Sequence, residues 1–138
     1  MKIAHKVLQF VGSVLGRNKL SILIYHQVVA TPDPMRPSEP AEAVFQWHMQ
    51  LIKDYMTPIS LEQAIDGLKN NSLPANAVCV TFDEGYINNL TVAQPILQQF
   101  SIPATVYIAT GFSEGANMFN DRIFDLIGDE QFTEFDLS

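Results

Sequence analysis

The sequence has a single cysteine and few basic side chains. Its 138 residues include one Cys, and eight Lys or Arg stand against 15 Asp or Glu, which gives a formal net charge of −7. One cysteine excludes an intrachain disulfide and any metal site built from several cysteines. Nucleic-acid binders carry basic patches, so the acidic balance predicts no nucleic-acid partner. We expect Cys79 to be a small buried residue of the core.

Histidine is scarce and unevenly placed. The three histidines, His5, His26 and His48, all lie within the first 48 residues, and no two of them are four residues apart. A His-x-x-x-His metal motif is therefore excluded anywhere in the chain. We expect His48, which lies beside the apolar stripe of a predicted helix, to be a packed residue rather than a ligand.

Long hydrophobic runs are also missing. No stretch is long enough to cross a bilayer. Residues 1–19 predict an N-terminal amphipathic helix with four basic side chains, packed on the domain or, alternatively, lying on a membrane surface. Gln9 interrupts the apolar sequence and no small-x-small cleavage site follows, which argues against a secretory signal. We therefore expect a cytoplasmic location, with peripheral membrane contact as the alternative.

The most informative stretch is residues 77–86, with the sequence AVCVTFDEGY. Four apolar residues predict a buried strand. Asp83 and Glu84 follow, and Gly85 permits a sharp turn directly after them. α/β folds build their active sites at the carboxyl ends of parallel strands. We interpret the two acids as candidate site residues, although a solvent-exposed acidic turn would have the same local sequence.

The rest of the chain alternates between predicted helices and strands. The predicted strands are 20–25, 56–59, 77–82 and 104–109, and the predicted helices are 41–55, 61–69, about 90–100 and 120–127. Such alternation favours an α/β fold with a parallel sheet, so the strand ends at His26, Asp83 and Thr110 should share one edge. The proline-rich segment 31–40 predicts a loop over that edge. We expect one domain over 20–128 and an acidic tail over 129–138.

Some of these predictions concern individual side chains. The strand over 20–25 is expected to be buried, because its sequence is almost continuously apolar. Ser60 and Gln63 form a predicted capping box, and Pro95 requires the regular helix to begin near it. The predicted buried faces are Phe45, Met49 and Ile52 in the helix 41–55, and Leu61, Ala64, Ile65 and Leu68 in the helix 61–69.

The segment VTFDEGY, residues 80–86, resembles the Thr-Phe-Asp-Asp-Gly-Tyr signature of polysaccharide deacetylases, the NodB-homology family. Three flanking stretches agree with it. Residues 24–26 look like the family's opening strand motif, and residues 94–97 with 102–108 look like its next helix and strand. Residues 120–122 resemble a motif of the branch associated with exopolysaccharide synthesis. The resemblance runs from about residue 20 to residue 128.

This resemblance implies a fold, an activity and a set of site residues. The fold would be the N-terminal part of a distorted (β/α) barrel with parallel strands and covering helices. The activity would be metal-dependent hydrolysis of a non-peptide carbon–nitrogen bond, removing N-acetyl groups from amino sugars in polysaccharides. Asp83 would be the general base and Glu84 a ligand of a divalent metal, with Zn²⁺ the cation that the resemblance favours. His26, Tyr86, Asn120 and Asp121 would lie on the rim of the site.

The sequence departs from the family pattern in two respects. Glu84 stands where the family usually has Asp, and its extra methylene moves the carboxylate by about an ångström. The downstream His-x-x-x-His ligands and the later family motifs are absent. We therefore interpret the chain as a truncated or split deacetylase that is inactive alone and that a complementary C-terminal half would complete.

Three other interpretations remain open. The chain could be a non-catalytic remnant that binds glycan or a partner chain, as the missing histidines and Glu84 suggest. A phosphotransfer site is less well supported, because the acids are adjacent and no phosphate-binding Gly-rich loop is present. The last is an α/β domain without a site.

Overall fold

The structure is a computed structural model that describes residues 12, 16, 18–112, 115 and 118–128. The predicted N-terminal helix over 1–19 lies almost entirely outside these residues, and the predicted acidic tail over 129–138 lies wholly outside them. The predicted domain over 20–128 is the part that the structure describes most completely.

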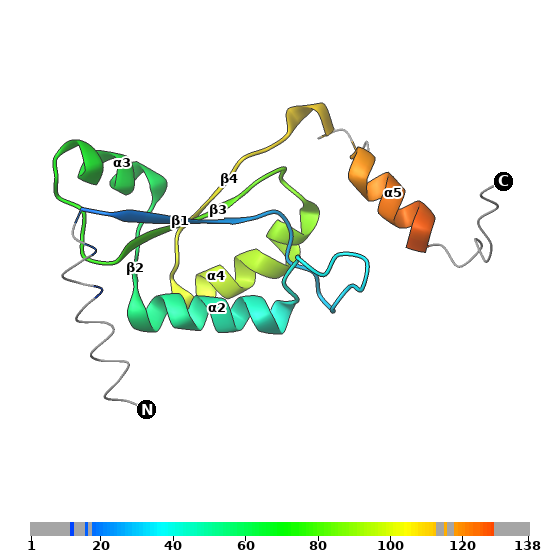
Figure 1. The fold of residues 1–138 in the computed structure, drawn as a ribbon, viewed down its shortest axis with the longest axis horizontal. Helices are drawn as coiled ribbons and strands as arrows, with labels where there is room; N and C mark the ends of the chain where they lie inside the picture. Colours follow the sequence, from blue (N-terminus) through cyan, green and yellow to red (C-terminus); the bar gives the residue numbers. More distant parts are fainter. Residues whose placement is uncertain (1–11, 13–15, 17, 113–114, 116–117, 129–138) are drawn as a thin grey trace.

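Strand β3 (Ala77–Phe82) is the centre of a parallel four-stranded sheet, and all six of its residues are buried. Strand β1 (Leu20–Tyr25) pairs with it along its whole length. On the opposite side, β2 (Thr57–Pro58) pairs with the first part of β3, and β4 (Ala104–Val106) pairs with its last three residues. The carboxyl ends of β1, β3 and β4 therefore meet at one edge of the sheet, as the sequence predicts (Figure 1).

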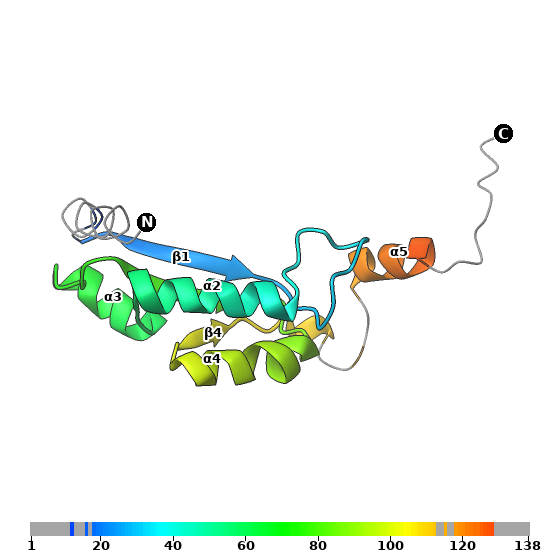
Figure 2. The same ribbon diagram turned by 90° about the horizontal axis from the view of Figure 1, so that it is seen from below.

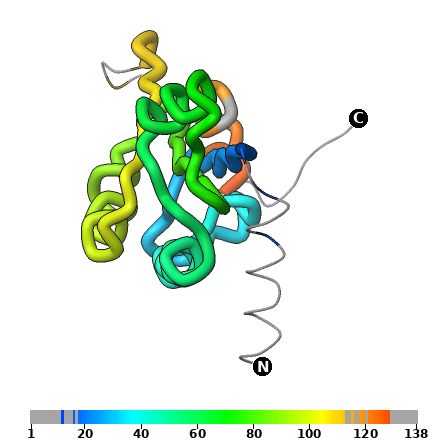
Figure 3. Tube along the Cα trace, turned by 90° about the vertical axis from the view of Figure 1, so that its left-hand side faces the viewer, coloured from blue at the N-terminus to red at the C-terminus, as the bar shows by residue number. Residues whose placement is uncertain are grey.

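Helices cover both faces of this sheet. Helices α2 (Glu42–Tyr55) and α4 (Gln94–Phe100) lie side by side on one face, and α3 (Leu61–Lys69) lies on the other (Figures 1 and 3). The main core fills the space between the sheet and the pair α2 and α4. Its buried members are Val28, Phe45, Met49, Ile52, Val78, Val80, Phe82, Ala93, Ile96, Leu97 and Ile102.

Local sequence signals explain how two of the helices begin. At the start of α3, Ser60 Oγ accepts a hydrogen bond from the backbone N–H of Gln63 at 3.2 Å, and Gln63 Oε1 accepts one from the backbone N–H of Ser60 at 3.0 Å. The predicted capping box is thus confirmed. Helix α4 has Pro95 in its first turn, where no N–H is needed. A π-helical segment, Asn89–Ala93, leads into it.

Two predictions about burial were wrong. Strand β1 is not fully buried: Ile22 is 49% exposed and Ile24 is 60% exposed, on the side opposite to Leu23 and Tyr25, which pack against the main core. In α3, Ile65 and Leu68 are exposed, while Ala64 and Gly67 are the buried residues. Small residues let α3 pack closely against the segment that follows it: a Cβ on Gly67 would lie only 2.8 Å from Leu73 Cδ2.

Two strands are shorter than predicted. β2 has two residues instead of four, and β4 has three instead of six. Beyond β4 the chain still follows the sheet for one residue, since the Tyr107 N–H donates to the carbonyl oxygen of Phe82 at 2.8 Å. A short 3-10 helix, Thr110–Phe112, then ends the extended segment.

Helix α5 (Phe119–Gly128) lies away from the sheet. It is found beyond the carboxyl ends of the strands, beside the loop that joins β1 to α2 (Figures 1 and 2). That loop is the proline-rich segment, and it lies at the sheet edge as predicted. Its base is fixed to α2 by hydrogen bonds from Val29 N–H to the Pro40 oxygen and from Glu42 N–H to the Val29 oxygen.

The packing of Phe45 gives a direct test of this core. Phe45 is fully buried, with its ring 5.1 Å from that of Tyr25 and 5.9 Å from that of Phe82. We predict that Phe45→Ala lowers the free energy of unfolding by roughly 3 to 5 kcal/mol, because it leaves a cavity between helix and sheet. Trp47→Ala, on the same helix but 59% exposed, should cost less than about 1 kcal/mol. Urea denaturation of both variants distinguishes these effects; equal losses would contradict this description of the core.

Candidate functional site

The predicted acid pair lies in the turn that follows β3. The Asp83 N–H donates to the Tyr25 oxygen at 2.9 Å, and the Ala109 N–H donates to the Glu84 oxygen at 3.3 Å. The turn is therefore fixed on one side to the end of β1 and on the other to the segment after β4. Such backbone anchoring on two strands is what positions side chains at the carboxyl edge of a parallel sheet.

Two successive residues of this turn have left-handed backbone conformations. Gly85 has φ +75°, which explains why a glycine follows the acids. A Cβ there would also lie 3.3 Å from Ile108 Cγ1. Glu84 has φ +74°, a conformation that costs a residue with a side chain about 1 kcal/mol or more. Because the backbone turns here, the side chains of Asp83 and Glu84 need not point in opposite directions as they would in a strand.

A cavity of about 430 Å³ opens beside the turn, and we call it the rim cavity. It brings together four of the predicted site residues, His26, Glu84, Tyr86 and Asp121, with Arg36, Glu39 and Phe124 among its other lining residues. Asp83, the predicted base, is half-buried and is not among the residues that line it. The side chain of Asn120 lies outside the described part of the structure.

Tyr86 connects the turn to helix α5. Its hydroxyl donates to Asp121 Oδ2 at 2.8 Å and also lies 3.6 Å from Met118 Sδ. Burial, the hydrogen bond to Asp121 and the negative charges of Asp121 and Glu84 raise the pKa of Tyr86 well above its usual value of 10.0. The phenol therefore stays protonated and remains a hydrogen-bond donor to Asp121.

Arg36 is the residue of this region that the sequence analysis missed. Its guanidinium pairs with Asp33 at 2.8 Å through Nη1, and with Asp121 at 3.4 Å and Asp125 at 3.2 Å through Nη2. The bond from Arg36 holds the pKa of the Asp33 carboxyl below its usual value. The only sequence signal for this residue is the i, i+3 spacing of Asp33 and Arg36. The contact with Asp121 could not be predicted, because Asp121 lies 85 residues after Arg36.

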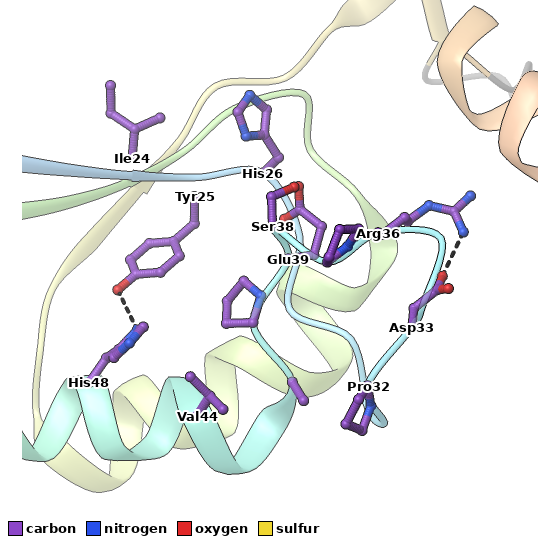
Figure 4. Close-up of a pocket in the computed structure, with 13 residues that line it drawn as sticks. Ile24, Tyr25, His26, Pro32, Asp33, Arg36, Ser38, Glu39, Val44 and His48 are labelled. Atoms are coloured by element: carbon purple, nitrogen blue, oxygen red, sulfur yellow. Dashed lines mark hydrogen bonds and ion pairs between the residues drawn. The ribbon is translucent and has the colours of Figure 1, made fainter.

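A second cavity, of about 580 Å³, lies on the other side of the proline-rich loop, between the end of β1 and α2 (Figure 4). Within it, the Tyr25 hydroxyl and His48 Nδ1 are hydrogen-bonded at 3.2 Å. His48 is half-buried, which agrees with the packing role predicted for it. His26 lies at the end of β1 and lines both cavities.

The donor set of the described residues does not complete a metal site. Among them, no group of three or more His, Cys, Asp or Glu side chains is placed to hold a metal ion. His26, Glu39 and Glu84 share the rim cavity without forming such a group. Further donors would have to come from outside the part of the chain described here.

The chain is similar to known proteins in both sequence and structure. No family model matches the chain. Among solved structures, the chain is similar to a de-N-acetylase from Aggregatibacter actinomycetemcomitans, with 27% identity, a TM-score of 0.62, and coverage of 70% of this chain and 40% of that one. It is also similar to the Streptococcus pyogenes deacetylase PplD, with 29% identity, a TM-score of 0.61, and coverage of 79% and 52%. IcaB from Ammonifex degensii, 23% identical with a TM-score of 0.61, supports the fold alone.

The fold and the strand-end motif of this chain are similar to those of polysaccharide deacetylase domains. The predicted resemblance and the predicted fold, part of a (β/α) barrel of NodB type, are both confirmed. Among curated proteins, the chain is similar to YxkH of Bacillus subtilis (strain 168), whose name assigns it to the polysaccharide deacetylases. The identity is 29% over 92 residues, covering 65% of this chain. The chain spans 32% of YxkH and between 40% and 52% of the two solved deacetylases.

The backbone of Glu84 leads to a stability prediction. Glu84→Gly should raise the free energy of unfolding by about 1 kcal/mol, because glycine adopts φ +74° without steric cost. Glu84→Ala removes the same carboxylate but keeps a Cβ, so it should bring no comparable gain. Urea denaturation measures both. If Ala stabilises as much as Gly does, the gain comes from removing the charge, and the backbone explanation is wrong.

Proposed function

We propose that this chain supplies the acid pair of a metal-dependent N-deacetylase acting on polysaccharides that contain N-acetylated amino sugars. One observation carries the proposal: β3 places Asp83 and Glu84 at the edge where β1 and β4 also end, next to the rim cavity. The similarity to two solved deacetylases at 27% and 29% identity supports it. Asp83 is the proposed base and Glu84 the proposed metal ligand.

The proposed reaction is hydrolysis of an amide. Water adds to the carbonyl carbon, the carbon–nitrogen bond breaks, and acetate and a free amine are formed. The carboxylate of Asp83 can accept the proton that the attacking water loses. The described donors do not by themselves form a metal site. Zn²⁺ remains the proposed cation, held once further donors join Glu84.

We propose that those donors lie outside this chain's 138 residues. All three histidines precede Asp83, and none follows Glu84. A complementary polypeptide would then be needed for turnover, and the chain alone would be inactive. In this proposal the partner supplies the remaining metal ligands, which are imidazole or carboxylate donors on a further barrel segment.

The structure has a surface that fits such a partner. Beside α4 and β4 is a cavity of about 660 Å³, with Leu97, Ile102, Val106 and Ile108 among its lining residues. Among the described strands, β4 pairs only with β3, so its outer edge is free to pair with another strand. Asn89 lines the same cavity; it is 7% exposed, and neither polar atom of its side chain has a hydrogen-bond partner in the described residues.

A non-catalytic remnant that binds glycan or a partner chain is the second candidate function. It is favoured by the substitution of Glu84 for the usual Asp and by the lack of downstream histidines. The location also remains a proposal: cytoplasmic, or in peripheral contact with a membrane through residues 1–19. Within the described residues, no helix has the length and apolar character needed to cross a bilayer.

A chimera tests the catalytic proposal. Residues 18–112 of this chain would replace the matching part of PplD, and acetate release from chito-oligosaccharides would be measured with added Zn²⁺. We expect the chimera to release acetate, and we expect Asp83→Asn in the chimera to lower the rate of release by at least about a hundredfold. Asp66→Asn, exposed on α3, should leave it unchanged. A folded chimera that releases no acetate would favour the remnant, and release by the isolated chain would contradict the need for outside donors.

The unpaired amide of Asn89 gives a prediction for the isolated chain. Asn89→Leu should raise the free energy of unfolding by about 1 kcal/mol or more, because a buried polar group without partners is replaced by an apolar group of similar size. Asn88→Leu is the contrasting variant, since Asn88 Nδ2 donates to Gln27 Oε1 at 2.9 Å and that bond would be lost. Thermal or urea unfolding measures both. A destabilising Asn89→Leu would mean that water already satisfies the amide.

A further inference from the structure

Helix α5 is held in place without a buried apolar side chain. None of its residues that the structure describes is buried, and Phe119, Leu126 and Ile127 are 75%, 58% and 51% exposed. The helix has ten residues, and isolated helices of that length are barely stable in water. The position of α5 must therefore be fixed by the residues on the side of the helix opposite to these exposed apolar side chains.

That other side carries a set of polar contacts with two separate parts of the chain. Asp121, Phe124 and Asp125 are spaced at i, i+3 and i+4, so they share one face of the helix. Arg36 Nη2 lies 3.4 Å from Asp121 and 3.2 Å from Asp125, and its guanidinium carbon lies 5.2 Å from the centre of the Phe124 ring. From the turn after β3, the Tyr86 hydroxyl donates to Asp121 at 2.8 Å.

Arg36 can bridge the loop and the helix because the two ends of its guanidinium face different partners. Nη1 is bound to Asp33 of its own loop at 2.8 Å, and this leaves Nη2 for the two carboxylates of α5. The side chains of Arg36 and Asp121 are only 19% and 15% exposed. Partial burial reduces screening by water and strengthens such charge-assisted bonds. A lysine has a single ammonium group and cannot make the same fork of contacts.

These contacts have a consequence for the rim cavity. Asp121 and Phe124, on the face of α5 that Arg36 contacts, line this cavity together with Glu84 and His26. The position of α5 therefore determines how open the cavity is to solvent and to any large substrate. No described residue of α5 has a buried side chain that could hold the helix in place by apolar packing.

We propose that Arg36 and Tyr86 form a polar latch that positions α5 as one wall of the rim cavity, and that releasing the latch opens the cavity. Arg36 is thus a positioning residue: it acts through Asp121 and Asp125. The latch is independent of the deacetylase activity proposed above, because it concerns access to the cavity and not the chemistry within it.

Hydrogen exchange followed by mass spectrometry tests the latch on the full chain. In Arg36→Gln, we expect amide exchange in residues 119–128 to rise on the order of tenfold, while exchange in β3 stays unchanged. Arg122→Gln is the matched control, since Arg122 is exposed on the same helix and makes none of the latch contacts. Arg36→Lys should give an intermediate rise, and Tyr86→Phe should give a smaller one than Arg36→Gln.

A second readout follows the cavity itself. Modification of Glu84 by a water-soluble carbodiimide should be faster in Arg36→Gln than in the wild type, with exposed Glu62 as the internal reference. Raising NaCl from about 0.05 M to about 1 M should accelerate α5 exchange in the wild type and change it little in Arg36→Gln. Unchanged α5 exchange in Arg36→Gln would overturn the proposal. So would a rise that extends to β3, or a rise of equal size in Arg122→Gln.

Discussion

The register of β3 between its neighbours is the constraint on which the rest of the structure depends. This strand is buried on both faces and pairs with β1 at six successive positions. Val78, Val80 and Phe82 point toward α2 and α4 and belong to the main core. A shift of one residue would turn these side chains to the opposite face. Burial therefore fixes where β3 ends, and with it the place of Asp83 and Glu84.

Backbone hydrogen bonds on both sides hold the turn that carries Asp83 and Glu84 in place. Bonds from Asp83 to the end of β1, and from Tyr107 and Ala109 back to residues 82 and 84, fix the turn between two strands. Glu84 adopts a left-handed backbone conformation in this turn, which is sterically unfavourable for a residue with a side chain. The conformation is less unfavourable for Asp than for Glu, because the short Asp side chain can hydrogen-bond its own backbone. Glu84 thus keeps a carboxylate at this position but has a less suitable side chain for the backbone there.

Much of the fold could be predicted from the sequence because it depends on local signals. The buried strand before Asp83, the capping box at Ser60 and the helix start near Pro95 each follow from a few neighbouring residues. Exposure of Ile22, Ile24 and Ile65 could not be predicted in this way, because an apolar pattern does not say whether another element covers it. Arg36 was missed for a similar reason: its partners on α5 are 85 and 89 residues away.

The described residues contain some of the groups that the proposed deacetylase site needs. The strand-end acids and the rim cavity are present, while no donor set in the described residues completes a metal site. The chain covers 40% and 52% of the two solved deacetylases that it resembles. Strand β4 and Asn89, whose amide has no hydrogen-bond partner in the described residues, line the same cavity of about 660 Å³.

Calorimetric titration of Zn²⁺ into the wild-type chain and into Glu84→Ala tests this account most directly. A site with one carboxylate and water molecules binds a divalent metal weakly. We therefore predict no saturable binding near about micromolar concentrations in either protein. Binding of about micromolar affinity or tighter in the wild type that is lost in Glu84→Ala would contradict it, because the chain would then hold a complete metal site of its own.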